Sequence, residues 1–366
     1  MAESRLNRVA AHGQSVWFDT LSRDLVQSGE LARMVEEDAV TGVTSNPTIF
    51  QKALSQDTAY DAQLKELLAE TDDATEIFFR LALEDIRDAC DVLAQVHEQK
   101  PWDGFVSMEV LPGLAYDTEK TFAQARWIAK EVDRPNLLVK IPATGPGLPA
   151  IEDCIAHGTS INVTLIFSLE RYKAVVEAYL RGLERLIAGG GDPSKVSSVT
   201  SFFVSRVDTE ADKRLAAVGN EESQGQLAIA NAKLAYEHFL ERFQGERWEY
   251  LKSKGAWPQR PLWASTSTKS PTYRDVMYVE ELIGPGTVNT MPLETIEAFQ
   301  EHGDVRGDTV TEGVDEARQV FADIAAAGVD YDDVVLTLEQ EGVQKFADSF
   351  AEILAGVAAK RETVAA

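Results

Sequence analysis

The sequence predicts an α/β protein that folds as a parallel (β/α)₈ TIM barrel with additional N- and C-terminal helices. Eight short runs rich in β-branched and aromatic residues end in polar residues, as buried parallel strands do. Amphipathic stretches with apolar residues at spacings of three and four separate these runs and are typical of helices. No Gly-rich dinucleotide or phosphate loop follows any run, so a doubly wound sheet lacks its usual motif.

The predicted strands and helices alternate along most of the chain. The strands are residues 15–19, 40–46, 105–110, 137–143, 161–167, 199–205, 261–265 and 287–292. Two long intervening helices are predicted at residues 76–99 and 168–190. In a closed barrel of such units the catalytic groups lie at the carboxyl ends of the strands. Functional residues are therefore expected near the end of each run.

The barrel is expected to occupy about residues 15–307. Helical patterns at 1–14 and 308–366 add to it, and a long insertion precedes the seventh strand. No Pro/Ser-rich linker or low-complexity segment divides the sequence, so residues 1–366 are expected to form a single domain.

The amino-acid composition limits the kinds of molecule that this chain is expected to bind. The formal charge of −25 repels nucleic acid and anionic membranes, so neither is expected, and an anionic substrate needs local basic residues. No run approaches the ~20 apolar residues of a membrane span, and the first residues lack a signal-peptide core, so a cytoplasmic location is expected. Cys90 and Cys154 lack metal or redox spacing and are expected to be inert reduced thiols.

Three predicted strands carry an ionisable residue: Asp19, Glu109 and Lys140. Buried charges are costly unless they are paired or neutralised, so this set indicates either catalysis or a structural ion-pair cluster. A lysine in the apolar run VKIPAT would have a lowered pKa, and its neutral amine could form a Schiff base with a ketone. Asp19 or Glu109 could then act as the base when a neighbouring carbon–carbon bond breaks. This chemistry requires no cofactor, and the scattered histidines predict no metal site.

Several segments together resemble one family. They are TGVTSNPTIF, VSMEV, VKIPAT, INVTLIFS, SFFVSRVD and TVNTMP, in this order along the predicted strands. The chain thereby resembles the transaldolases of the pentose phosphate pathway. The resemblance implies transfer of a dihydroxyacetone unit from sedoheptulose 7-phosphate or fructose 6-phosphate to glyceraldehyde 3-phosphate or erythrose 4-phosphate. Small-molecule sugar phosphates are the implied partners, and the oligomeric state remains open between monomer and homodimer.

The resemblance implies a catalytic role for Lys140, Asp19, Glu109 and Thr164. Lys140 matches the Schiff-base lysine, and Asp19 matches the general acid/base that takes the proton of the C4 hydroxyl as the C3–C4 bond breaks. Glu109 matches the carboxylate that shuttles protons through a water placed with Thr164. Two other interpretations remain: Asp19 could cap the next helix, and Glu109 could pair with Lys140.

The resemblance also implies a site for the bound three-carbon fragment. Asn46 and Asn162 match the side chains that hold its hydroxyl groups, and Thr44 supports them. Asn46 precedes Pro47 and is also a common turn residue, while Thr44 could simply fill a strand.

A phosphate site is implied at Ser201 and Arg206, with Phe203 lining it. Arginine can clamp phosphate bidentately. The alternatives are an ion pair of Arg206 with Asp208 or Glu210, and a packing role for Phe203.

The chain departs from the family pattern after the seventh strand. Some transaldolases carry an arginine in an ASFR string, whereas this sequence reads ASTSTKS, so the second phosphate cation would be Lys269. Lysine binds phosphate as a point charge without a fork.

Two rival functions remain. A fructose 6-phosphate aldolase-type Schiff-base lyase would use the same lysine but release the three-carbon unit. A noncatalytic sugar-phosphate-binding barrel would keep the phosphate residues but would not need Lys140, Asp19 and Glu109 together.

Overall fold

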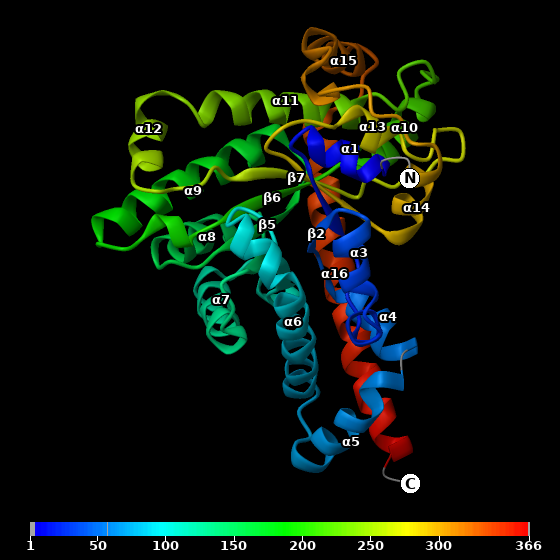
Figure 1. Cartoon of the computed structure of the whole chain (residues 1–366). Helices are drawn as coiled ribbons and strands as arrows, with labels where there is room; N and C mark the ends of the chain where they lie inside the picture. The colour runs from blue at the N-terminus through cyan, green and yellow to red at the C-terminus, as the bar shows by residue number, and fades with distance from the viewer. Residues whose placement is uncertain (1–3, 57, 365–366) are drawn as a thin grey trace.

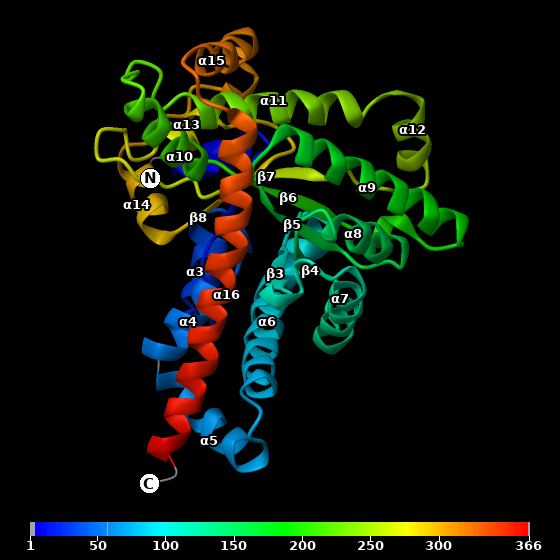
Figure 2. The ribbon, with the colours of Figure 1, turned by 180° about the vertical axis from the view of Figure 1, so that it is seen from behind.

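The computed structural model describes residues 4–56 and 58–364, and its centre is a closed barrel of parallel strands that follow one another in chain order (Figures 1 and 2). The strands are β1 Ser15–Phe18, β2 Val40–Val43, β3 Val106–Glu109, β4 Leu137–Pro142, β5 Ile161–Ile166, β6 Ser198–Phe203, β7 Arg260–Ala264 and β8 Val288–Met291. Each predicted run overlaps a strand, and β6 and β7 each begin one residue earlier than predicted, so the predicted barrel is confirmed. Nearly every strand residue is buried, as expected when helices cover the outside of a parallel barrel.

Helices surround the barrel (Figure 1). In chain order they are α1 Arg5–Ala11, α2 Arg23–Gln27, α3 Glu30–Glu37, α4 Pro47–Gln56, α5 Asp61–Glu70, α6 Ala74–Gln99, α7 Thr118–Val132, α8 Gly147–Ala156, α9 Leu169–Ala188, α10 Ser205–Ala217, α11 Leu227–Arg242, α12 Gly245–Ser253, α13 Met277–Glu281, α14 Leu293–His302, α15 Val314–Ala326 and α16 Tyr331–Val364. Within the described ranges, no helix has both the length and the apolarity that a membrane crossing requires.

The ends of the long helices follow from short-range sequence signals. Asp73 caps α6 by accepting hydrogen bonds from the amides of Thr75 and Glu76. Ser168 caps α9 by accepting from the amide of Arg171 at 3.0 Å. Such caps satisfy amide groups that have no partner within the helix, so the predicted helices form close to their expected positions.

The C-terminal helix α16 crosses the carboxyl end of the barrel (red in Figure 2) and packs against α4, α6, α10 and the end of β5. Gly342 permits this close approach, because an added Cβ would lie only 3.0 Å from a methyl carbon of Leu165. The hydroxyl groups of Thr48 and Ser349, 2.7 Å apart, also tie α16 to α4. The sequence predicts helical structure here but not its location, and the structure places α16 over the barrel mouth.

The two cysteines are buried and unpaired. Burial raises the pKa of both thiols, which disfavours the nucleophilic thiolate at neutral pH. The prediction of inert reduced thiols agrees with these positions.

Candidate active site

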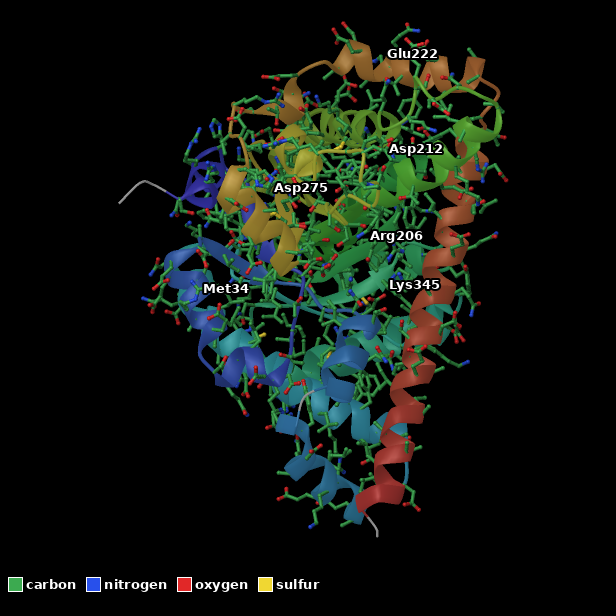
Figure 3. The ribbon with its side chains drawn as sticks, turned by 90° about the vertical axis from the view of Figure 1, so that its right-hand side faces the viewer. Met34, Arg206, Asp212, Glu222, Asp275 and Lys345 are labelled. Atoms are coloured by element: carbon green, nitrogen blue, oxygen red, sulfur yellow. The ribbon has the colours of Figure 1, made fainter. Side chains whose placement is uncertain are left out.

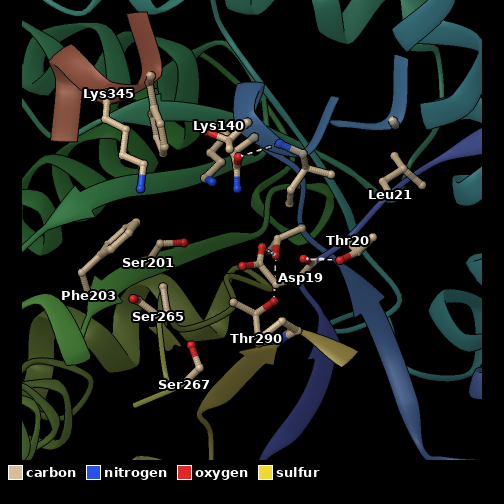
Figure 4. Close-up of a pocket in the computed structure, with 18 of the residues that line it drawn as sticks. Asp19, Thr20, Leu21, Lys140, Ser201, Phe203, Ser265, Ser267, Thr290 and Lys345 are labelled. Atoms are coloured by element: carbon tan, nitrogen blue, oxygen red, sulfur yellow. Dashed lines mark hydrogen bonds between the residues drawn. The ribbon is translucent and has the colours of Figure 1, made fainter. Parts of the chain in front are cut away.

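A cavity of about 840 Å³ opens at the carboxyl end of the barrel (Figure 4). Most of the predicted site residues line it: Asp19, Thr44, Asn46, Lys140, Ser201, Phe203, Arg206 and Lys269. The other three, Glu109, Asn162 and Thr164, are buried in β3 and β5, the strands that flank β4. The barrel therefore brings residues from distant parts of the sequence to one end, as its strand geometry requires.

Lys140 lies on β4 and is only 4% exposed. Its Nζ donates a hydrogen bond to the carbonyl oxygen of Ser45 at 3.2 Å and lies 3.5 Å from Glu109 Oε2. The strand register aligns Lys140 with Glu109 on one side and with Asn162 on the other. The ion-pair interpretation of Glu109 is thus confirmed, and the same contact places a carboxylate beside the amine.

The side chains of Glu109 and Thr164 have polar atoms without hydrogen-bond partners among the described residues. Neither carboxylate oxygen of Glu109 accepts a hydrogen bond in the described part of the chain, and the same holds for the hydroxyl of Thr164. Burial raises the pKa of Glu109 to about 7, and the charge of Lys140 opposes this shift. A carboxyl group with a pKa near neutrality can both donate and accept protons at physiological pH.

Asp19 directly follows β1 at the wall of the cavity (Figure 4). Its carboxylate accepts a hydrogen bond from Thr44 Oγ1 at 2.7 Å, and Thr44 Oγ1 lies 2.7 Å from Thr290 Oγ1. Burial raises the pKa of Asp19, while Lys140 and the Thr44 hydroxyl oppose the shift. The helix-cap alternative for Asp19 is wrong, because Ser22 caps α2.

The two predicted asparagines are held in different ways. Asn46 Oδ1 accepts the amide of Ile49 at 3.1 Å, so the turn interpretation applies to its oxygen, although Asn46 also lines the cavity. Asn162 donates from Nδ2 to Ser107 Oγ at 3.0 Å and accepts from Ser201 Oγ at 2.8 Å. In this arrangement Ser201 orients Asn162, because its hydroxyl proton points to the amide oxygen and not to the cavity.

Arg206 lies in the first turn of α10 and stacks on an aromatic ring. Its guanidinium carbon lies 5.0 Å from the centre of the Phe203 ring. No carboxylate within the described ranges forms an ion pair with it, and the alternative pairing with Asp208 or Glu210 is wrong: Asp208 accepts the hydroxyl of Tyr278, and Glu210 binds later residues of α10. The guanidinium of Arg206 therefore lines the cavity without an ion-paired carboxylate among the described residues.

Lys269 lies at the exposed rim of the cavity and donates a hydrogen bond to Ser267 Oγ at 2.7 Å. Burial and the nearby charge of Arg206 lower its pKa, and Glu294 opposes them. The predicted second cation thus lies close enough to Arg206 for the two charges to interact.

Sequence reasoning missed several residues that line this cavity: Thr290, Glu294, Lys345 and Phe346. Ser265 and Ser267 also line the cavity and belong to the polar stretch ASTSTKS after β7, which the sequence places at the carboxyl end of the strand. Lys345 and Phe346 belong to α16, and no local pattern indicates that this helix crosses the barrel mouth.

Comparison with known proteins identifies the family of this chain. The sequence profile described as Transaldolase/Fructose-6-phosphate aldolase matches residues 16–357. A transaldolase of Frankia alni is 52% identical over 357 residues, 96% of each chain. Transaldolases of Mycolicibacterium paratuberculosis and Mycobacterium bovis are 52% and 50% identical, over 95% and 98% of each chain respectively. The chain therefore belongs to the transaldolase/fructose-6-phosphate aldolase family.

Proposed function

We propose that this cavity carries out the transaldolase reaction through a Schiff base on Lys140. The donor is sedoheptulose 7-phosphate or fructose 6-phosphate, and the acceptor is glyceraldehyde 3-phosphate or erythrose 4-phosphate. One observation supports this most strongly: Lys140 is buried at the cavity wall with its Nζ 3.5 Å from Glu109, a carboxylate without another hydrogen-bond partner in the described ranges.

The first step forms the imine. The neutral amine of Lys140 attacks the C2 carbonyl of the ketose, and a proton transfer gives a carbinolamine. Glu109 supplies a proton to the C2 hydroxyl, which leaves as water while the carbon–nitrogen double bond forms. The raised pKa of Glu109 suits this role, because the carboxyl group then holds a proton close to neutral pH. The hydroxyl of Thr164, which has no hydrogen-bond partner among the residues that the structure describes, is available to position the water.

The second step breaks the C3–C4 bond. The Asp19 carboxylate takes the proton of the C4 hydroxyl, the C4 carbonyl forms, and the bonding electron pair moves into the iminium. The aldose phosphate leaves, and the dihydroxyacetone unit stays on Lys140 as an enamine. Asn46 and Asn162 hold its hydroxyl groups. Transfer reverses these steps with the second aldehyde, and Asp19 returns the proton.

Arg206 and Lys269 bind the phosphate of donor and acceptor. Both line the same cavity, and their positive charges provide the local attraction that a chain of net charge −25 needs for an anionic sugar. The net charge of −25 disfavours nucleic acid as a partner. All the residues invoked belong to one chain, so a monomer suffices and a homodimer is compatible with the mechanism.

Reductive trapping tests the proposal directly. The protein is incubated with fructose 6-phosphate and sodium borohydride, and the modified peptide is mapped by mass spectrometry. A reduced dihydroxyacetone adduct on Lys140 is the expected result. An adduct on another lysine, or none on folded protein, contradicts the assignment. Adding glyceraldehyde 3-phosphate and comparing the transfer product with free dihydroxyacetone separates a transferase from an aldolase-type lyase.

Glu109→Gln is expected to slow imine formation by about 10²-fold, the usual scale for one general acid. The raised pKa leaves Glu109 protonated below about 7 and ionised above it, so water loss in the wild type should slow as pH rises through 7. The variant should lose this dependence. The rate of borohydride-trappable adduct formation between pH 6 and 8 measures both effects. The control is Glu119→Gln, which removes the same negative charge from an exposed position on α7.

A further inference from the structure

A third cation enters the candidate active site from the C-terminal helix. Lys345 of α16 lines the same cavity as Arg206 and Lys269. Its side chain extends from the helix into the cavity, and Lys345 and Arg206 lie on the same side of the barrel beside α16 (Figures 3 and 4). We propose that Lys345 is a substrate-binding residue that holds the phosphate group of the sugar together with Arg206 and Lys269. This inference rests on the proposed function.

The position of Lys345 is fixed by close packing on either side of it. Gly342, three residues earlier, rests on Leu165 at the end of β5. Phe346, the next residue, is 4% exposed, and its ring centre lies 5.7 Å from Lys140 Nζ. The contact between Thr48 and Ser349 holds the following turn of α16. The backbone of Lys345 therefore cannot move away from the cavity unless these contacts break.

The charges around the cavity indicate why a third cation is useful. A phosphate monoester carries a charge of about −1.5 to −2 at neutral pH. Three acids, Asp19, Asp24 and Glu294, line the same cavity as Arg206 and Lys269 and offset their positive charge. Lys345 adds positive charge to this lining, in a chain whose net charge is −25.

The reaction also requires a phosphate site that adapts. C2 of either donor is fixed on Lys140. The phosphate lies on C6 in fructose 6-phosphate and on C7 in sedoheptulose 7-phosphate, so it is one carbon farther from Lys140 in the second sugar. The two acceptors place their phosphates at the same two positions once the new bond forms. A lysine is a mobile point charge on a flexible stem, so it can follow a shift of one carbon better than a fixed fork. Lys345 can supply this adjustable contact, while Arg206 is held against Phe203.

The test compares two acceptors that differ only in the phosphate. In Lys345→Gln, kcat/KM for glyceraldehyde 3-phosphate is expected to fall about tenfold, the loss expected of one hydrogen bond to a charged group. With unphosphorylated glyceraldehyde it should stay within about twofold of the wild type, because no phosphate contact is lost. Lys345→Arg should recover most of the loss. Lys195→Gln removes an exposed lysine at the amino end of the barrel and should change neither value.

An equal loss with both acceptors, or no loss with the phosphorylated one, overturns the proposal, because Lys345 would then act on the fold or not at all. Calorimetric titration with inorganic phosphate gives a second readout that needs no turnover, and the Kd should rise about tenfold in Lys345→Gln.

Borohydride trapping distinguishes failure of this inference from failure of the proposed function. If wild type forms the Lys140 adduct but Lys345→Gln binds phosphate normally, only this inference fails. If wild type forms no adduct, the proposed function fails, and the phosphate titration alone decides the role of Lys345.

Discussion

Lys140→Met is expected to lower transaldolase activity by about 10⁴-fold or more, because the variant has no amine to form the imine and no other route to the same intermediate. Methionine fills a similar volume in the apolar surroundings of β4. The borohydride adduct should disappear as well. Transfer from fructose 6-phosphate to erythrose 4-phosphate, followed by the release of glyceraldehyde 3-phosphate, measures the first effect, and mass spectrometry measures the second.

The stability of this variant is expected to depend on pH. Loss of Lys140 leaves Glu109 buried without its counter-charge, which costs about 3–5 kcal/mol when the remaining charge cannot be neutralised. Glu109 can avoid most of this cost by keeping a proton, because burial already raises its pKa to about 7. A carboxyl whose pKa is raised by folding favours the folded state at low pH and loses that contribution as pH rises through the folded pKa. The Tm of Lys140→Met should therefore be close to that of the wild type at pH 6 and lower at pH 8.

Lys140→Arg is the matched control for charge. It keeps a cation beside Glu109, yet its guanidinium stays protonated and cannot attack a carbonyl. This variant should be as inactive as Lys140→Met at both pH values. Transfer above about 1% of wild type by either folded variant would contradict the assignment of Lys140 as the nucleophile.

The strands of this barrel are predictable because their signal is local. The segment LLVKIP is buried at every position, and an apolar run containing one lysine predicts a strand near a site. The run at residues 40–46 is longer than its strand, Val40–Val43, because Asn46 uses its side-chain oxygen to start α4. The strand pattern and the helix start overlap there, and only the folded backbone separates them.

The part of the site that lies at the carboxyl ends of the strands could be predicted from the sequence. Parallel strands bring their carboxyl ends to one rim, so Asp19, Lys140 and Arg206 could be grouped from sequence. The role of Ser201 could not be obtained this way, because its hydrogen bond to Asn162 depends on the register between β5 and β6. Lys345 could not be found either, since its place depends on the long-range packing of α16 across the barrel.

Asp19→Asn is expected to lower transfer by about 10³-fold, a typical loss when a general base is removed. An amide cannot take the proton of the C4 hydroxyl, so the C3–C4 bond should stay intact. Lys140 and Glu109 remain, and imine formation should still occur. Borohydride should therefore trap the whole six-carbon sugar phosphate on Lys140, whereas the wild type should yield the three-carbon adduct. The masses of the two adducts distinguish the outcomes.

Two further variants separate the role of Asp19 as a base from its charge. Asp24→Asn removes a carboxylate from the same cavity rim and should still give the three-carbon adduct. Thr44→Val removes the hydroxyl that donates to Asp19 at 2.7 Å, which should raise the pKa of Asp19 further. Because the base must be ionised, the acid limb of kcat should then move to higher pH. A three-carbon adduct formed by Asp19→Asn at the wild-type rate would require another base for the cleavage step, and an unchanged acid limb in Thr44→Val would mean that Asp19 does not control it.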